Sequence, residues 1–128
     1  MTRLHAATDM RATLAALALL VAAAPAHAGD AARGKQLYDT RCVGCHSIDA
    51  NRIGPAHRGV FGRKAGAIKA YDYSAAVRDS RVVWDARTLD RWLAGPEQLI
   101  PGQRMNYSVA EPADRADLIA YLRDQSRR

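Results

Sequence analysis

The sequence predicts a small all-α protein. Three segments carry apolar residues at the spacing of a helix, and no segment shows the alternating pattern of a convincing strand. At 128 residues, of which 48% are hydrophobic, the chain can build one core but is too short for two. We therefore expect a single helical domain.

The first predicted helix covers residues 30–42, in which Leu37, Tyr38 and Arg41 fall near one face. Gly34 lies inside this helix, at a cost of about 1 kcal/mol relative to alanine. A close contact with another helix is the expected reason for a glycine at this position.

Further helices are predicted after a Gly-rich loop over residues 48–69. A short helical turn is expected at 74–79, a helix over 85–96 with an aspartate cap and a Gly-Pro stop, and a last helix over 111–125 with proline in its first turn. The apolar residues expected to face the core are Leu89, Trp92, Leu93, Leu118, Ile119, Tyr121 and Leu122.

The first 28 residues are expected to lie outside this domain. Two arginines precede an apolar run over residues 12–24, which ends in "PAHA". These features are typical of a secretory signal peptide cleaved after Ala28, and the run is shorter than the roughly 20 residues of a membrane-spanning helix. An uncleaved anchor is the alternative. We predict a signal peptide over 1–28, a domain over 29–128 and export to a bacterial periplasm.

The charge of the predicted mature chain is moderately positive. Its 17 lysines and arginines against 12 acidic residues give a formal charge of +5, and the charges are interspersed. This pattern indicates a solvated surface, with no nucleic-acid partner and at most peripheral membrane contact. A diffuse positive face for an acidic protein partner is compatible with it.

Both cysteines of the chain lie in "CVGCH", at Cys42 and Cys45, directly before His46. An oxidising compartment would permit a disulfide between them, as in a thiol oxidoreductase, but no strand pattern flanks the motif as that class requires. A zinc site would need a further pair of histidines, and the only other histidine of the mature chain is His57. C-x-x-C-H is the attachment motif of c-type haem, in which two thioethers hold the porphyrin and the histidine binds iron.

Met105 is the candidate for a second iron ligand, because it is the only methionine after the signal peptide. It follows a loop, residues 95–105, that contains two prolines and a Pro101-Gly102 turn. If the haem has His/Met ligation, the sulfur must come from Met105, and a stiff loop would hold it on iron. The alternative is a methionine that fills the core.

Eight segments in order resemble class I cytochromes c, specifically the mitochondrial-type branch and its bacterial relatives. They are "GDAARGKQLY", "CVGCH", "GP" at 54–55, "GVFGRKAG", "YDYS", "VVWDARTL", and "IPGQRM" followed by "RADLIAYL". The resemblance covers nearly all of the mature chain. It implies the cytochrome c fold, in which the first and last helices cross and the helices surround one covalently bound haem c.

The resemblance also implies roles for individual residues. His46 and Met105 would be the iron ligands, and the Pro55 carbonyl would orient the His46 ring. The residues that match propionate-binding positions are Arg63, Tyr73 and Trp84, and those at the crossing of the first and last helices are Gly34, Tyr38 and Tyr121.

Two haem-site positions depart from the family pattern. Trp92 stands where the family commonly has a tyrosine whose hydroxyl contacts the methionine sulfur, and indole is a donor only. We therefore expect an altered reduction potential and count Trp92 among the haem-binding residues. His57 stands where the family usually has a leucine. We expect a hydrogen-bonded core histidine there, and a spare iron ligand is the alternative.

The function that the resemblance implies is transfer of single electrons, without bond chemistry, by a monomer. Partners would be a reductase or dehydrogenase as donor and an oxidase or peroxidase as acceptor. Several lysines of the mitochondrial proteins are missing at the matching positions, whereas Arg41 and Arg104 keep positive charge and are expected to face the partner. The alternatives are weak peroxidase-like or ligand-sensing activity if Met105 leaves the iron, and a fixed subunit of a larger complex.

Overall fold

The structure, a computed structural model, describes residues 27–128. The predicted signal peptide therefore lies outside the described residues except for His27 and Ala28. Five helices follow one another along the described chain: α1 (Ala31–Arg41), α2 (Ala75–Arg78), α3 (Ala86–Ala94), α4 (Pro96–Leu99) and α5 (Pro112–Gln125). Residues 27–128 contain no strand, and none of their helices is long and apolar enough to cross a membrane. The all-α prediction is thus confirmed.

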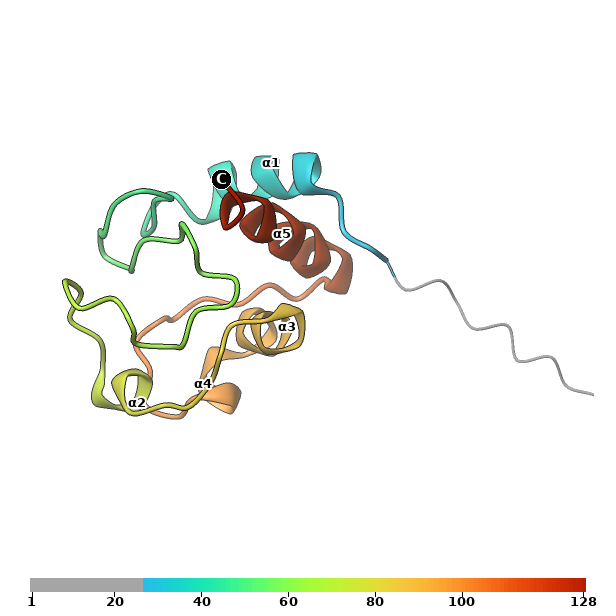
Figure 1. Cartoon of the computed structure of the whole chain (residues 1–128). Coiled ribbons are helices and arrows are strands. Elements are labelled where there is room, and N and C mark those ends of the chain that lie inside the picture. Colours follow the sequence, from blue (N-terminus) through green and yellow to red (C-terminus); the bar gives the residue numbers. More distant parts are fainter. Residues whose placement is uncertain (1–26) are drawn as a thin grey trace, which may run out of the picture.

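The helices α1 and α5 pack closely side by side (Figure 1). Asp30 caps α1 by accepting hydrogen bonds from two backbone amides of the first turn. A Cβ atom on Gly34 would come within 1.9 Å of the Asp117 carbonyl oxygen, so only glycine permits this approach. Beside it, the rings of Tyr38 and Tyr121 lie 5.2 Å apart. The predicted helix crossing is present at the predicted residues.

A cluster of ionic groups ties the same crossing together. Arg33 forms ion pairs with both Asp114 and Asp117, and Arg41 Nη1 lies 2.9 Å from Asp114 Oδ2. The two carboxylates are buried, and Asp117 also accepts a hydrogen bond from the Asp30 backbone amide at 2.7 Å. Buried carboxylates need such partners, because desolvation of an unpaired charge is costly.

Helix α3 begins with a capping box between Asp85 and Thr88 and places Leu89 and Leu93 in the core. As predicted, it ends at a Gly-Pro step. Pro96 does not end helical structure there, however, because it occupies the first position of α4, where a missing amide hydrogen is tolerated. The segment 95–105, which we expected to be a loop throughout, therefore begins with one helical turn.

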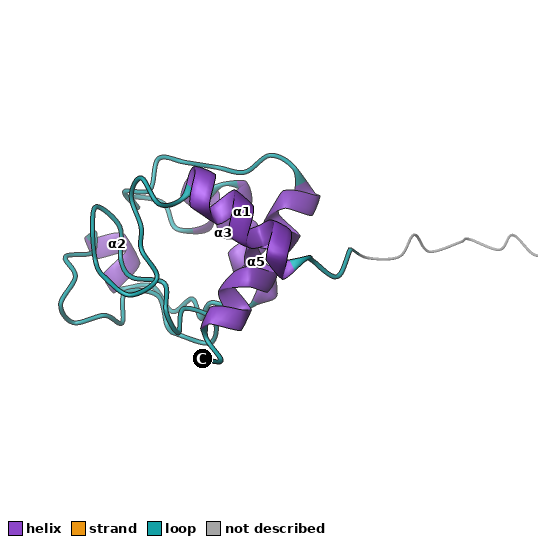
Figure 2. Cartoon of the chain, turned by 90° about the horizontal axis from the view of Figure 1, so that it is seen from above, coloured by secondary structure: helices purple, strands orange, loops and turns teal. Residues whose placement is uncertain are grey.

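The long connection between α1 and α2 is a loop with one short antiparallel contact. Trp84 donates its backbone amide to the Arg63 carbonyl at 2.9 Å, and Gly62 donates to the Trp84 carbonyl at 2.6 Å. Seen from above in Figure 2, α1, α3 and α5 gather on one side and this loop with α2 on the other. The contact joins this connection to the segment between α2 and α3 and brings Arg63 next to Trp84.

Candidate functional site

The "CVGCH" motif directly follows α1 as a tight turn. The backbone amides of Cys45 and His46 both donate to the Cys42 carbonyl, at 3.1 and 2.9 Å. Both thiols are free, with Cys45 exposed and Cys42 half-buried. Burial raises the pKa of the Cys42 thiol to about 11, although the nearby Arg41 charge opposes this. The motif thus presents two unpaired thiols and one imidazole on a single turn.

The His46 ring is fixed by the loop that follows it. Its Nδ1 lies 2.8 Å from the Pro55 carbonyl oxygen, so Nδ1 carries the hydrogen and donates it. Burial lowers the pKa of His46, which favours the neutral ring with a free lone pair on Nε2. A Cβ atom on Gly54 would lie within 2.6 Å of three ring atoms, so the glycine backbone lies against the imidazole.

His57 stacks on His46 with 4.0 Å between ring centroids and 20° between the planes. Its Nδ1 also lies 3.0 Å from the Tyr38 hydroxyl oxygen. Burial, followed by the nearby charges of His46 and Arg63, lowers the pKa of His57 well below 6.5. The hydrogen bond matches the expectation for His57, but the residue is half-buried and lies outside the buried core. The stack on His46 was not foreseen, because no sequence pattern signals it.

The loop before Met105 is held by side-chain contacts to α4. Glu97 accepts a hydrogen bond from the Gly102 backbone amide at 3.0 Å and another from the Gln103 side chain at 3.2 Å. Gln103 in turn accepts a bond from the Met105 amide. Gly102 has a φ of +89°, a conformation that favours glycine at this turn. Met105 is half-buried and packs against the hydrophobic core.

Arg63 is a half-buried cation without a carboxylate partner among the described residues. Its guanidinium donates to the backbone carbonyls of Ala56 and Arg58, at 2.9 and 3.0 Å. Burial lowers its pKa, and the nearby Tyr73 hydroxyl opposes this. Burial raises the pKa of Tyr73. A positive group in this setting is suited to bind an anion.

Two tryptophans form a pair close to Arg63. Trp84 is buried, and the half-buried ring of Trp92 lies 5.2 Å from it with 59° between the planes. Trp92 comes from α3 and Trp84 from the segment just before this helix, so the capping box that starts α3 also fixes the pair. The structure therefore brings Arg63, Trp84 and Trp92 into one neighbourhood.

The residues present fit a covalently bound haem c. Two free thiols can form thioethers, the Nε2 lone pair of His46 can bind iron, and Arg63 lacks the anion that a propionate would supply. Apolar side chains that are only partly covered by the protein can pack on a porphyrin. They are Leu37, Cys42, Ile48, Phe61, Tyr73, Ala76, Val82, Trp92, Leu99 and Met105.

The two arginines expected to face a partner are both exposed but engaged with carboxylates. Arg41 pairs with the buried Asp114, whereas Arg104 lies 3.4 Å from the exposed Asp72. The first pair belongs to the ionic cluster between α1 and α5. Arg104 therefore has the less constrained positive charge of the two.

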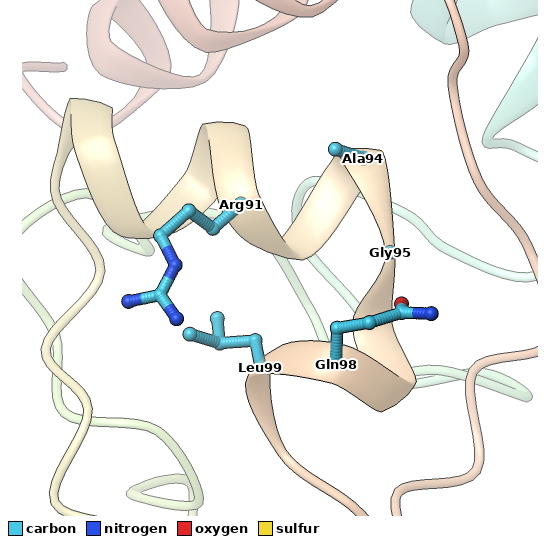
Figure 3. Close-up of a pocket in the computed structure, with 5 residues that line it drawn as sticks. All are labelled: Arg91, Ala94, Gly95, Gln98 and Leu99. Carbon is cyan, nitrogen blue, oxygen red and sulfur yellow. The ribbon is translucent and has the colours of Figure 1, made fainter.

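A separate surface pocket of about 260 Å³ lies at the turn between α3 and α4 (Figure 3). It is lined by Arg91, Ala94, Gly95, Gln98 and Leu99. Of these five residues, only Leu99 also belongs to the apolar set that can pack on a porphyrin. We do not assign it to the candidate site.

Comparisons with known proteins agree on one family. Residues 31–126 match the family model described as cytochrome c. Cytochrome c 2.1 of Caenorhabditis elegans is 43% identical over 77% of this chain and 92% of its own length, and cytochrome c of Gibberella zeae is 40% identical over 77% and 97%. Among solved structures, cytochrome cH from Methylobacterium extorquens matches with a TM-score of 0.71 and 38% identity, over 75% of this chain and 99% of that one.

Proposed function

This chain belongs to the cytochrome c family, and from that premise we propose that it is an exported electron carrier whose iron is bound by His46 and Met105. As a member of the family it binds one haem c, attached through Cys42 and Cys45. It is an electron-transfer protein and not an enzyme. Three points are our proposal: the pair of iron ligands, the export of the protein and its redox partners.

The hydrogen bond between His46 and Pro55 carries the proposal. A Nδ1 that donates to a carbonyl leaves Nε2 unprotonated, which is the state needed for metal binding, and raises the basicity of the ligand. The bonds between Glu97 and the loop hold Met105 on a braced segment. When bound, haem c supplies an iron that changes oxidation state by one electron, and His/Met ligation favours a raised potential.

The remaining site residues have supporting roles in the proposal. Arg63 and Tyr73, with the buried Trp84, would bind a haem propionate, because the partners of Arg63 within residues 27–128 are neutral backbone carbonyls. Trp92 would pack near the methionine side. Both iron positions would be occupied by protein ligands, which leaves no open position for a substrate.

The test is an optical spectrum of the protein matured in a bacterial periplasm. The oxidised wild type is expected to show the far-red charge-transfer band of methionine sulfur bound to iron, and Met105→Ala to lose it. Gln98→Ala, a change at an exposed position of α4 that removes no sulfur, serves as the matched control and should keep the band. A band that persists in Met105→Ala would contradict the ligand assignment.

The proposed partners are redox proteins of the exported compartment, with a reductase or dehydrogenase as donor and an oxidase or peroxidase as acceptor. A monomeric shuttle is favoured by a single compact domain and a net positive charge. Purification from the native source tests this point. Isolation of the protein in a stable complex would favour the alternative of a fixed subunit.

A further inference from the structure

His57 contacts both His46, the predicted iron ligand, and Tyr38 at the crossing of α1 and α5. Its ring stacks on His46 at 4.0 Å, and its Nδ1 is within hydrogen-bond distance of the Tyr38 hydroxyl, at 3.0 Å. Tyr38 is only 2% exposed and packs on Tyr121 of α5. A continuous set of contacts therefore runs from the crossing of α1 and α5 to His46.

We propose that Tyr38 and His57 act as a positioning pair that fixes the plane of the His46 ring relative to the haem. The inference rests on the proposed function, because it takes His46 as an iron ligand. It assigns a role to a histidine at a position where the family usually has leucine.

The hydrogen bond to Pro55 does not fully fix the plane of the His46 ring. It holds only the Nδ1 edge, so the ring can still turn slightly within the slack of that bond. A second ring stacked 20° from parallel opposes this turn, since His46 could not rotate without collision. The glycine backbone at Gly54, which also lies against the ring, narrows the space further.

The stack is effective only if His57 is itself fixed. An imidazole could rotate about its own bond to Cβ, but its hydrogen bond with the Tyr38 hydroxyl selects one orientation. A leucine at this position would contact His46 without any bond to Tyr38.

The test uses the holoprotein and two variants, Tyr38→Phe and His57→Leu. In an oxidised low-spin haem, the plane of the histidine ligand determines how unpaired spin spreads over the porphyrin. The proton NMR shifts of the haem methyl groups therefore report the His46 orientation. Both variants are expected to shift these resonances and the midpoint potential, and the double variant to shift them no further than His57→Leu alone.

Tyr121→Phe is the matched control. It removes a hydroxyl at the same crossing that makes no hydrogen bond to His57, and it should leave the methyl resonances in place. Methyl resonances and a potential in Tyr38→Phe equal to those of Tyr121→Phe would overturn the proposal. If His57→Leu does not mature into a holoprotein, the result for Tyr38→Phe is sufficient to test the proposal. This variant should fold, because the phenylalanine ring still fills the core.

Failure of the proposed function would look different. If the wild-type spectrum lacks the far-red band, Met105 is rejected as a ligand. The methyl shifts would still report a bound His46. A wild-type haem without histidine ligation would overturn both the ligand assignment and the positioning pair. If the wild type shows the band but Tyr38→Phe and His57→Leu leave the methyl resonances unchanged, only the positioning pair would be overturned.

Discussion

Single atoms determine how His46 can act. The Pro55 carbonyl fixes the hydrogen on Nδ1, and burial lowers the pKa of the ring, so Nε2 is the nitrogen suited to iron. Arg63 shows the complementary principle. A half-buried cation whose partners are two backbone carbonyls indicates where an anionic group of a cofactor would lie.

Trp92 is the residue whose substitution should alter the reduction potential. The family's tyrosine hydroxyl can donate to or accept from its neighbours, whereas an indole only donates. We expect Trp92→Tyr to change the midpoint potential in a redox titration while the far-red band is retained. Tyr107→Phe, which removes a hydroxyl from an exposed ring, is the control. An unchanged potential in Trp92→Tyr would remove Trp92 from the account of redox tuning.

At the scale of elements, the crossing of α1 and α5 combines a close backbone approach with a buried ionic cluster. The approach depends on Gly34, and the cluster depends on two aspartates one helical turn apart on α5. The helix propensity of glycine is poor, so packing against α5 must compensate for it. Stability of the fold should therefore respond strongly to this one contact.

Gly34→Ala is expected to destabilise the protein by about 3 kcal/mol or more, because overpacking at rigid backbone is costly. The added Cβ would meet the Asp117 carbonyl at 1.9 Å, and this atom belongs to the backbone of α5. Gly44→Ala is the control, since its Cβ would meet nothing within 4 Å. Chemical denaturation of both holoproteins compares them, and equal unfolding midpoints would contradict the steric argument.

The ionic cluster predicts a dependence of stability on pH. Burial alone would raise the pKa of Asp117, but hydrogen bonds from the Asp30 amide, Arg33 and His27 lower it to about 2 from 3.8. Cleavage after Ala28 would remove His27 and leave the Asp30 amide and Arg33 as the groups that lower the pKa. A pKa depressed by folding stabilises the protein above pH 4, and this contribution is lost as pH falls through 2.

Asp117→Asn should therefore unfold at a lower temperature than the wild type at pH 6. This difference in unfolding temperature should be smaller near pH 2. Asp79→Asn, at an exposed site, is the control. Thermal unfolding over this pH range measures the effect. A difference between Asp117→Asn and wild type that stays constant from pH 6 to pH 2 would reject the linkage.

At the scale of the whole molecule, the positive charge should steer encounters with negative redox partners. Screening shortens the range of such attraction to about 8 Å at physiological ionic strength. We expect the rate of oxidation by ferricyanide, an anionic oxidant, to fall as salt is added. A rate independent of salt would show that the surface charge does not guide the encounter.

The two arginines should contribute unequally to this steering. Arg41 is paired with Asp114 within the ionic cluster, whereas the exposed Asp72 is a weaker partner for Arg104. Arg104→Gln is therefore expected to reduce the salt dependence more than Arg41→Gln does. Stopped-flow rates at several ionic strengths give the comparison. A larger loss of salt dependence in Arg41→Gln would show that the ion pair with Asp114 does not weaken the contribution of Arg41 to steering.

The sequence by itself determined the helices, the family and the cofactor. Each depends on local spacing: apolar residues at helical intervals, a cap at Asp85, and two cysteines with His46 within five residues. The same local patterns predicted the crossing at Gly34 once the family was identified. The one-turn helix α4 was missed because a Gly-Pro step ends one helix and can start another.

Only the tertiary structure decided how distant residues meet. The stack of His57 on His46, its bond to Tyr38 and the pairing of Arg41 with Asp114 join positions 11, 19 and 73 residues apart. No periodicity encodes such contacts, since they arise when loops and helices pack together into one core. The attachment of haem could be read locally, whereas the environment that orients His46 required the folded chain.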